Sequence, residues 1–169
     1  MSLFAGCGGS SLGYAKAGYR EVLAIDWNAE AIATLQSNMP EVPVLHKDIR
    51  QTTLDELLKL SGVEVRQLDL LDAFPPCQGF STAGRRQFTD SRNDLCFEFV
   101  RILIGMQPKA FVMENVAGLI KGPMKQVYLE LVKQLRVAGY FCRGEILNAC
   151  HFGLTQNRRR VFIVGLRAD

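Results

Sequence analysis

One cysteine in the 169-residue sequence stands where its thiol could act as a nucleophile. Cys77 follows two prolines in the segment FPPCQGFS, residues 74–81, at the end of an apolar run. Proline fixes its own φ and restricts the residue before it, so the backbone that carries this thiol is held. A cysteine attacks as the thiolate, and nearby positive charge favours that form. For this residue alone, a buried and unreactive thiol is the alternative.

A carboxylic acid and a group of arginines follow later in the chain. Glu114 comes directly after an apolar run, in the segment MENV. An acid at a helix N-terminus is the alternative interpretation of that residue. In QNRRRVFIVG, residues 156–165, the side chains of Gln156, Arg158 and Arg160 alternate, so an extended chain would turn all three to one side. A solvated basic edge is the alternative for the arginines.

The segment FAGCGGSSLG, residues 4–13, has the composition of a loop that approaches a ligand closely. Its glycines allow a tight turn, and because they have no side chain, a ligand can approach the backbone closely. Asp26 lies about 20 residues after the first glycine, the spacing at which an acid usually holds a ribose diol. Trp27 could lie on an adenine face, and Asp48 and Ile49 follow the next strand. These residues predict an adenosine-type pocket, although the glycine pattern fits a nicotinamide dinucleotide about as well.

Short apolar runs alternate with amphipathic segments, which predicts an α/β fold with a doubly wound, mostly parallel sheet. We expect strands over residues 2–4, 21–25, 42–46, 68–74, 110–115, 140–148 and 161–166. We expect helices near residues 11–17, 28–37, 54–60 and 94–106, and a long helix that Pro123 opens and Gly139 closes. In such sheets, ligands bind beyond the carboxyl ends of the strands, where all the residues above would lie.

Composition narrows the class of protein. The length suits one domain, residues 1–169, and no apolar stretch is long enough to span a bilayer. The five cysteines are odd in number and include no C-x-x-C pair, and only two histidines occur. We therefore expect neither a disulfide scaffold nor a metal site, and a reducing compartment. The arginines gather at Arg85, Arg86 and Arg92 and at residues 158–160, which suits phosphate contacts or two solvated surface patches.

The segments SLFAGCGG, FPPCQGFS, MENV and QNRRRVFIVG, in this order, resemble the successive motifs of the cytosine-5 DNA methyltransferases, and IDWN and KDI resemble the weaker cofactor motifs of that family. The resemblance implies a Rossmann-like fold of the S-adenosylmethionine-dependent methyltransferases, with an antiparallel last strand. It implies methyl transfer to carbon 5 of cytosine in double-stranded DNA. The cysteine adds to carbon 6 of a base that has been flipped out of the duplex.

The resemblance also implies a role for each site residue. Cys77 would be the nucleophile, Glu114 would hold or protonate ring nitrogen 3, and Arg158 and Arg160 would stabilise the substrate. The residues expected to bind S-adenosylmethionine are Phe4, Ala5, Gly6 and Gly8 around the cofactor, Asp26 at the ribose, Trp27 and Ile49 at the adenine faces, Asp48 at the adenine amino group, Leu95 at the methionine side, and Pro75. The residues expected to contact the DNA are Gln78, Ser81, Arg85, Arg86 and Gln156, most of them in a loop over residues 78–92.

The sequence departs from the family pattern in three places. Neither a target-recognition domain nor the final helix follows residue 169, and Met1 and Ser2 stand where an acid usually opens the first strand. We therefore expect either a split subunit whose partner chain supplies recognition or a fragment, with little sequence-specific methylation by this chain alone. A bacterial-type cytoplasmic or nucleoid location and a role in restriction–modification are expected. The alternatives are a nicotinamide-dependent dehydrogenase, a non-catalytic or partner-dependent binding subunit, and a tRNA cytosine methyltransferase.

Overall fold

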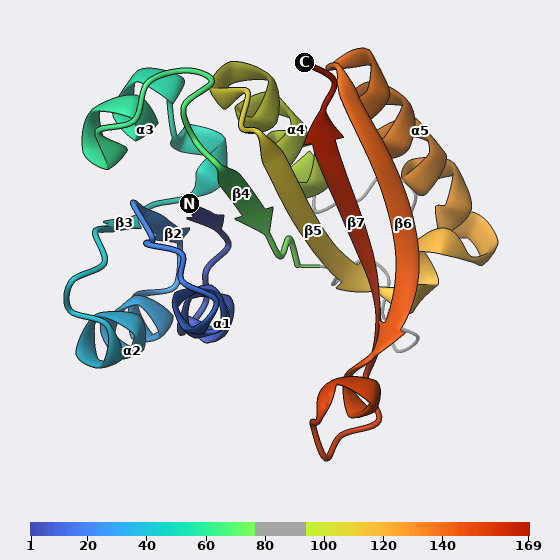
Figure 1. Ribbon diagram of the computed structural model, residues 1–169, viewed down its shortest axis with the longest axis horizontal. Coiled ribbons are helices and arrows are strands. Elements are labelled where there is room, and N and C mark those ends of the chain that lie inside the picture. Colours follow the sequence, from blue (N-terminus) through green and yellow to red (C-terminus); the bar gives the residue numbers. More distant parts are fainter. Residues whose placement is uncertain (77–93) are drawn as a thin grey trace.

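A computed structural model describes residues 1–76 and 94–169 of the chain. In this part of the chain, seven strands form one sheet in the order β3-β2-β1-β4-β5-β7-β6 (Figure 1). The strands are β1 (Ser2–Leu3), β2 (Ala24–Asp26), β3 (Val44–His46), β4 (Leu70–Ala73), β5 (Ala110–Val116), β6 (Tyr140–Asn148) and β7 (Arg159–Arg167). Strands β1 to β5 pair in parallel, and β7 runs antiparallel to both β5 and β6. The predicted mostly parallel sheet with an antiparallel last strand is confirmed.

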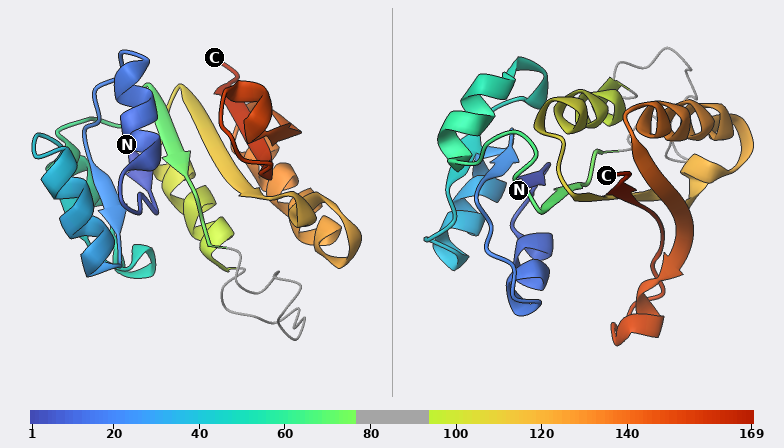
Figure 2. Two further views of the ribbon diagram at one scale, coloured as in Figure 1. Left: turned by 90° about the horizontal axis from the view of Figure 1, so that it is seen from below. Right: turned by 45° about the horizontal axis from the view of Figure 1, so that its top comes forward.

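Helices cover both faces of the sheet, as a doubly wound fold requires. The helices are α1 (Gly9–Lys16), α2 (Ala29–Asn38), α3 (Leu54–Ser61), α4 (Asp94–Met106) and α5 (Lys125–Val137). Figure 2 shows α3, α4 and α5 over one face, with α1 and α2 over the other. Short 3₁₀ turns lie between these elements, at Ile49–Gln51, Ala117–Ile120, Gly122–Met124 and Ala149–Phe152.

The hydrophobic core is much larger on the α3–α5 face. There Leu57, Phe99, Leu103 and Leu135 pack as fully buried side chains, together with strand residues such as Phe111. On the other face, a small cluster lies under α2 and consists of Ala5, Ala24, Leu35, Met39 and Val42. The sequence alternation of β5 and β7 explains the difference, since every second residue turns toward α4 and α5 and is buried.

The second face of β5, β7 and β6 carries exposed apolar side chains. Phe141 is 74% exposed, Val164 45% and Leu166 60%. They are neighbours in the sheet, because Leu166 pairs with Phe141 and Val164 comes two residues before Leu166 on β7, which turns it to the same face. Figure 1 shows α5 behind these strands and no helix of the described chain in front of them.

Local signals in the sequence set most helix ends. The Asn28 side chain accepts a hydrogen bond from the Ala31 amide at 2.9 Å and caps α2 as predicted. Gly139 follows α5 with φ of +91°, the left-handed conformation that ends a helix most easily at glycine. Strands differ more from the prediction: β2 begins at Ala24 rather than residue 21, and β4 covers Leu70–Ala73 rather than residues 68–74. Within residues 1–76 and 94–169, no helix has the length and apolarity needed to cross a membrane.

Candidate active site at the carboxyl ends of the strands

A pocket of about 230 Å³ lies where β1, β2 and β3 end. Its walls combine apolar and acidic side chains with an exposed indole. The lining residues are Phe4, Ile25, Asp26, Trp27, Lys47, Asp48, Ile49, Arg50, Pro76 and Leu95. Most of the predicted cofactor residues are therefore gathered around one cavity, although they come from four separate stretches of the chain. The indole of Trp27 is 70% exposed, which leaves a ring face free to stack on a planar ligand.

The glycine turn after β1 is tied to the predicted ribose acid. Phe4 and Gly6 both have positive φ, +59° and +55°, so the chain turns sharply as it leaves the strand. The Gly6 amide donates to Asp26 Oδ2 at 2.8 Å, and the Asn28 amide donates to Oδ1 at 2.9 Å. These bonds orient the Asp26 carboxylate at the pocket and leave lone pairs on both oxygens for a ligand hydroxyl.

Gly8 is needed for its backbone and for its size. Its φ is +88°, and a Cβ built on it would lie 3.2 Å from Leu35 Cγ in α2. Ala5 is buried in the small core under α2, so it supports the turn from below. The predicted cofactor loop is thus a tight backbone cradle, with Ala5 and Gly8 packed against the protein and Phe4 at the cavity.

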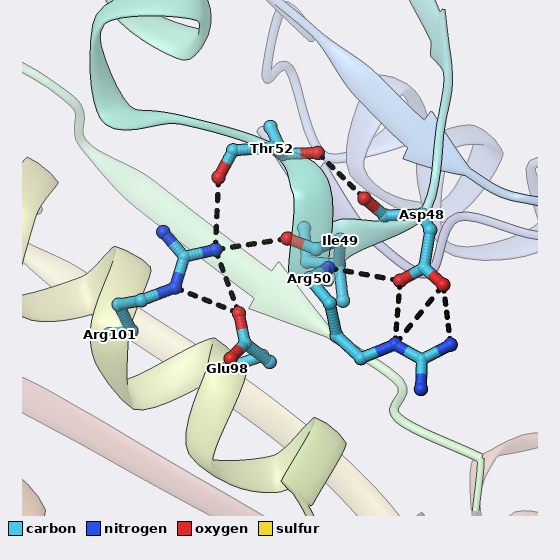
Figure 3. A network of polar contacts seen from close by, with 6 residues as sticks. All are labelled: Asp48, Ile49, Arg50, Thr52, Glu98 and Arg101. Carbon is cyan, nitrogen blue, oxygen red and sulfur yellow. Dashed lines mark hydrogen bonds and ion pairs between the residues drawn. The ribbon is translucent and has the colours of Figure 1, made fainter.

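The side of the pocket that is predicted to face an adenine is formed by a turn that begins at Asp48 (Figure 3). The Asp48 carboxylate accepts from the Arg50 amide at 2.9 Å and pairs with the Arg50 guanidinium at 2.5 Å. The bonds from Arg50 lower the pKa of Asp48 despite some burial, so this residue is an anion at neutral pH. Ile49 is buried to 4% exposure and still lines the cavity.

A second pocket, of about 310 Å³, contains the predicted acid and arginines. Glu114 lies near the end of β5, and its Oε1 is 3.0 Å from Arg160 Nε at the start of β7. Arg158 lines the same pocket, whose apolar walls include Phe152 and Phe162. Burial raises the pKa of Glu114, and the charges of Arg160 and Arg158 oppose that rise. The pocket therefore places a carboxyl with a raised pKa beside two cations.

The ends of β4 and β5 are joined by a buried side chain. Asn115, 3% exposed, donates from Nδ2 to the Pro75 carbonyl at 3.3 Å. Its Oδ1 accepts from the Val116 amide at 2.8 Å, so the amide group is fixed at both ends. Pro75 is itself buried. Asn115 thus holds the Pro75 backbone, at the end of β4, next to the strand that carries Glu114.

Several predicted residues lie outside the described part of the chain. They are Cys77, Gln78, Ser81, Arg85 and Arg86, together with Arg92. Their assignment stays a prediction. The described cysteines, Cys7, Cys96, Cys142 and Cys150, are free thiols, and burial raises the pKa of Cys96 to about 12, so that thiol is not a nucleophile.

The expected alternation of Gln156, Arg158 and Arg160 is only partly correct. β7 begins at Arg159, and the Arg158 amide bonds to the Gln156 carbonyl at 3.0 Å, so the chain turns tightly at Gln156. Arg158 and Arg160 do share one pocket, whereas Gln156 does not line it. Asn157 and Arg159 line another cavity.

Sequence reasoning missed two kinds of site residue. Lys47, Arg50 and Pro76 line the first pocket and are chain neighbours of predicted residues, so adjacency could have found them. Asn115 and Arg101 act on backbone groups 40 to 52 residues away in the chain, and no local pattern indicates such contacts.

The sheet order, the reversed last strand and the pocket beyond β1 to β3 define a Rossmann-like fold of the S-adenosylmethionine-dependent methyltransferases. The chain belongs to the family of C-5 cytosine-specific DNA methylases, because the sequence model of that family matches residues 1–169.

Individual relatives agree with the family. The chain is 38% identical over 169 residues to the Type II methyltransferase M.XorII of Xanthomonas oryzae pv. oryzae, covering 99% of this chain and 40% of that protein. It is 39% identical over 176 residues to the Type II methyltransferase M.AquIA of Picosynechococcus sp., covering 71% of that protein. A crystal structure of a prophage-encoded DNA modification methyltransferase from E. coli superimposes with a TM-score of 0.85 at 28% identity, over 98% of this chain and 45% of that one. The chain therefore spans less than half the length of two of these three relatives.

Proposed function

We propose that this chain forms the catalytic core of an enzyme that transfers a methyl group from S-adenosylmethionine to carbon 5 of cytosine in DNA. The observation that carries the proposal is Glu114: a carboxyl with a raised pKa, paired with Arg160 at the same sheet edge as an adenosine-type pocket. Family membership supports the same reaction.

The residues of the first pocket fit S-adenosylmethionine. The Asp26 carboxylate would accept hydrogen bonds from the ribose hydroxyls. Trp27 and Ile49 would lie against the adenine, and the Asp48 carboxylate would accept a hydrogen bond from the adenine amino group. Leu95 and Phe4 supply apolar surface on the remaining walls. When bound, the cofactor supplies an electrophilic methyl group on a sulfonium.

The second pocket supplies the acid chemistry. Carbon 5 of cytosine is a poor nucleophile until the Cys77 thiolate adds its electron pair to carbon 6 and breaks the ring conjugation. The electrons displaced toward ring nitrogen 3 take the proton that Glu114 donates, which stabilises the adduct. Arg160 and Arg158 then stabilise the Glu114 carboxylate that remains. Once carbon 5 carries the methyl group, a base removes its proton, the thiolate leaves, and the nitrogen 3 proton returns to the Glu114 carboxylate, which together restore the ring.

Recognition of a DNA sequence is proposed to require residues beyond those of this chain, in a second subunit or elsewhere in a longer protein. The motivation is that M.XorII is matched over only 40% of its length. DNA is the proposed substrate, and Gln78, Ser81, Arg85, Arg86 and Gln156 are the proposed contacts.

The test combines a cofactor titration with a covalent trap. S-adenosylhomocysteine, the demethylated cofactor, should bind the purified chain in calorimetry, NAD should not, and Asp26→Ala should weaken binding. An oligonucleotide containing 5-fluorocytosine, added with S-adenosylmethionine to the complete enzyme that includes the recognition residues, should form a denaturant-resistant adduct with this chain and none with Cys77→Ala. Binding of NAD in place of S-adenosylhomocysteine would refute the proposal, and so would an adduct that persists in the cysteine variant.

A further inference from the structure

The turn that presents Asp48 and Ile49 is short and depends on support from outside. It is a single 3₁₀ turn of three residues, Ile49–Gln51, flanked by Asp48 and Thr52. Its backbone bonds run from the Gln51 amide to the Asp48 carbonyl at 3.0 Å and from the Thr52 amide to the Ile49 carbonyl at 3.2 Å, and Thr52 Oγ1 also donates to the Asp48 carbonyl at 3.1 Å. Short 3₁₀ turns have poorer hydrogen-bond geometry than α-helices, so few bonds fix this backbone from within.

Arg101 supplies support from α4 (Figure 3). Its Nη2 donates to the Ile49 carbonyl at 2.9 Å and to the Thr52 carbonyl at 3.0 Å. The Ile49 carbonyl belongs to the first residue of the turn and also accepts from the Thr52 amide, and Thr52 is the residue that follows the turn, so Arg101 joins the two ends of the turn. Bonds from a charged donor are stronger than bonds between neutral groups.

The guanidinium is held in place on its other side. Arg101 Nε donates to Glu98 Oε2 at 2.8 Å, and Nη2 lies 2.7 Å from the same oxygen. Glu98 precedes Arg101 by three residues on α4, so the two side chains share one face of the helix. The planar fork is thereby oriented toward the turn, an arrangement that a lysine ammonium would reproduce only in part.

Arg101 does not line the cofactor-type pocket, whereas Asp48 and Ile49 do. We propose that Arg101 is a positioning residue of the cofactor site: it clamps the turn so that the Asp48 carboxylate and the Ile49 side chain face the adenine. The inference rests on the proposed function, because it assumes an adenine ring in that pocket. The Arg101 clamp also links two walls of the pocket: α4, whose Leu95 lines it directly, and the turn that carries Asp48 and Ile49.

The test uses Arg101→Met, which keeps the aliphatic stem and removes every donor. Hydrogen exchange of the Gln51 and Thr52 amides, measured without cofactor, should be faster in the variant. Affinity for S-adenosylhomocysteine should fall by about tenfold, the range expected for bonds from a charged donor. Arg101→Lys should recover part of the affinity. Lys133→Met is the matched control, since Lys133 pairs with Glu130 three residues before it on α5.

A double-mutant cycle separates positioning from general destabilisation. If Arg101 acts through the turn, Arg101→Met should cost less affinity in an Asp48→Asn background, because the contact it positions is already weakened. It should also reduce the preference for adenosyl over inosyl homocysteine, since the inosyl ring lacks the amino group that Asp48 accepts.

Each outcome has a distinct meaning. Unchanged exchange at Gln51 and Thr52 would overturn the clamp itself. Faster exchange with unchanged affinity and unchanged base preference would leave Arg101 a structural role and overturn the positioning claim. If the unmodified chain bound no S-adenosylhomocysteine, the proposed function would fail and the positioning claim with it, while the exchange data would still report whether Arg101 holds the turn.

Discussion

At the residue scale, the site depends on one carboxyl whose proton affinity is set by opposing effects. Burial of Glu114 favours the neutral acid, and Arg160 at 3.0 Å favours the anion. The net result is a raised pKa, so at any given pH a larger fraction of Glu114 carries a proton than of an ordinary glutamate.

Glu114→Gln removes the transferable proton and keeps the size of the side chain. We expect the methylation rate of the complete enzyme to fall by about 10²–10⁴-fold, the usual contribution of general acid–base catalysis. Because the protonated form is the active one, the rate limited by Glu114 should decline as pH rises through the raised pKa, and the variant should lack that limb of the profile. Single-turnover rates across pH would show this, and an unchanged profile in Glu114→Gln would count against the acid role.

A second buried acid lies away from the site and affects stability. Asp72 on β4 is 1% exposed and accepts from Ser2 Oγ at 2.7 Å. Burial raises its pKa from an ordinary 3.8 to about 6, although the Ser2 bond and the N-terminal ammonium oppose the rise. At a pH between 3.8 and about 6, Asp72 therefore keeps its proton in the folded protein and has lost it in the unfolded chain.

The sign of the pH dependence follows from linkage. Between about pH 4 and 6, Asp72 binds fewer protons in the unfolded state than in the folded state, so its contribution to the free energy of unfolding should fall as pH rises and level off above pH 6. The decline should be up to roughly 3 kcal/mol. Asp72→Asn should flatten it, as urea titrations at several pH values would reveal. The exposed Asp69→Asn serves as control, and a decline that survives in Asp72→Asn would assign it to another group.

At the element scale, the sequence predicted helices better than strands. Helix α4 matches its predicted range, Asp94–Met106, because its apolar spacing and ends are local properties. Strand ends depend on the neighbouring strand: β2 starts at Ala24 because the ladder to β1 starts there, opposite Ser2. Gln156 was misplaced for a related reason, since the ladder of β7 begins only at Arg159. Arg101 and Asn115 could not be predicted, because their acceptors lie on other elements.

The pairing of β5 with β7 requires a residue without a side chain. Gly165 lies opposite Phe111, and a methyl group built on it would overlap the Phe111 ring. Gly165→Ala must displace that fully buried ring and should cost roughly 1–3 kcal/mol of unfolding free energy, as overpacked cores do. Gly13→Ala in α1 meets no atom within 4 Å and should be neutral or stabilising. Denaturant midpoints compare the two, and equal effects would contradict the packing argument.

At the scale of the whole molecule, the two faces of the sheet are unequal. In residues 1–76 and 94–169, helices α3, α4 and α5 cover one face, while α1 and α2 do not reach over β5, β7 and β6 on the other (Figure 2). The open area carries Phe141, Val164 and Leu166 side by side. Contiguous exposed apolar surface of this kind promotes association.

Phe141→Lys should therefore reduce self-association of the purified chain without a large loss of stability, because Phe141 is already 74% exposed. Light scattering against concentration would measure the first effect and thermal melting the second. Val137→Lys places the same charge on α5, where Val137 is 82% exposed, and should leave association unchanged. Equal scattering from both variants would show that net charge, and not the open face, governs association.

The antiparallel pairing of β7 against β5 ties the chemistry to a matter of parity. Glu114 and Arg160 meet because Val116 lies opposite Arg160 and Glu114 opposite Phe162, which puts both charged side chains on one face. Deleting a single residue within β7, after Arg160, would turn the Arg160 side chain to the face that α4 covers. Deleting two residues would keep it on the same face as Glu114, shifted by two residues along β5. Proteins related to this chain should thus tolerate insertions and deletions in the Ala149–Phe152 connection far more readily than insertions or deletions of an odd number of residues inside β7.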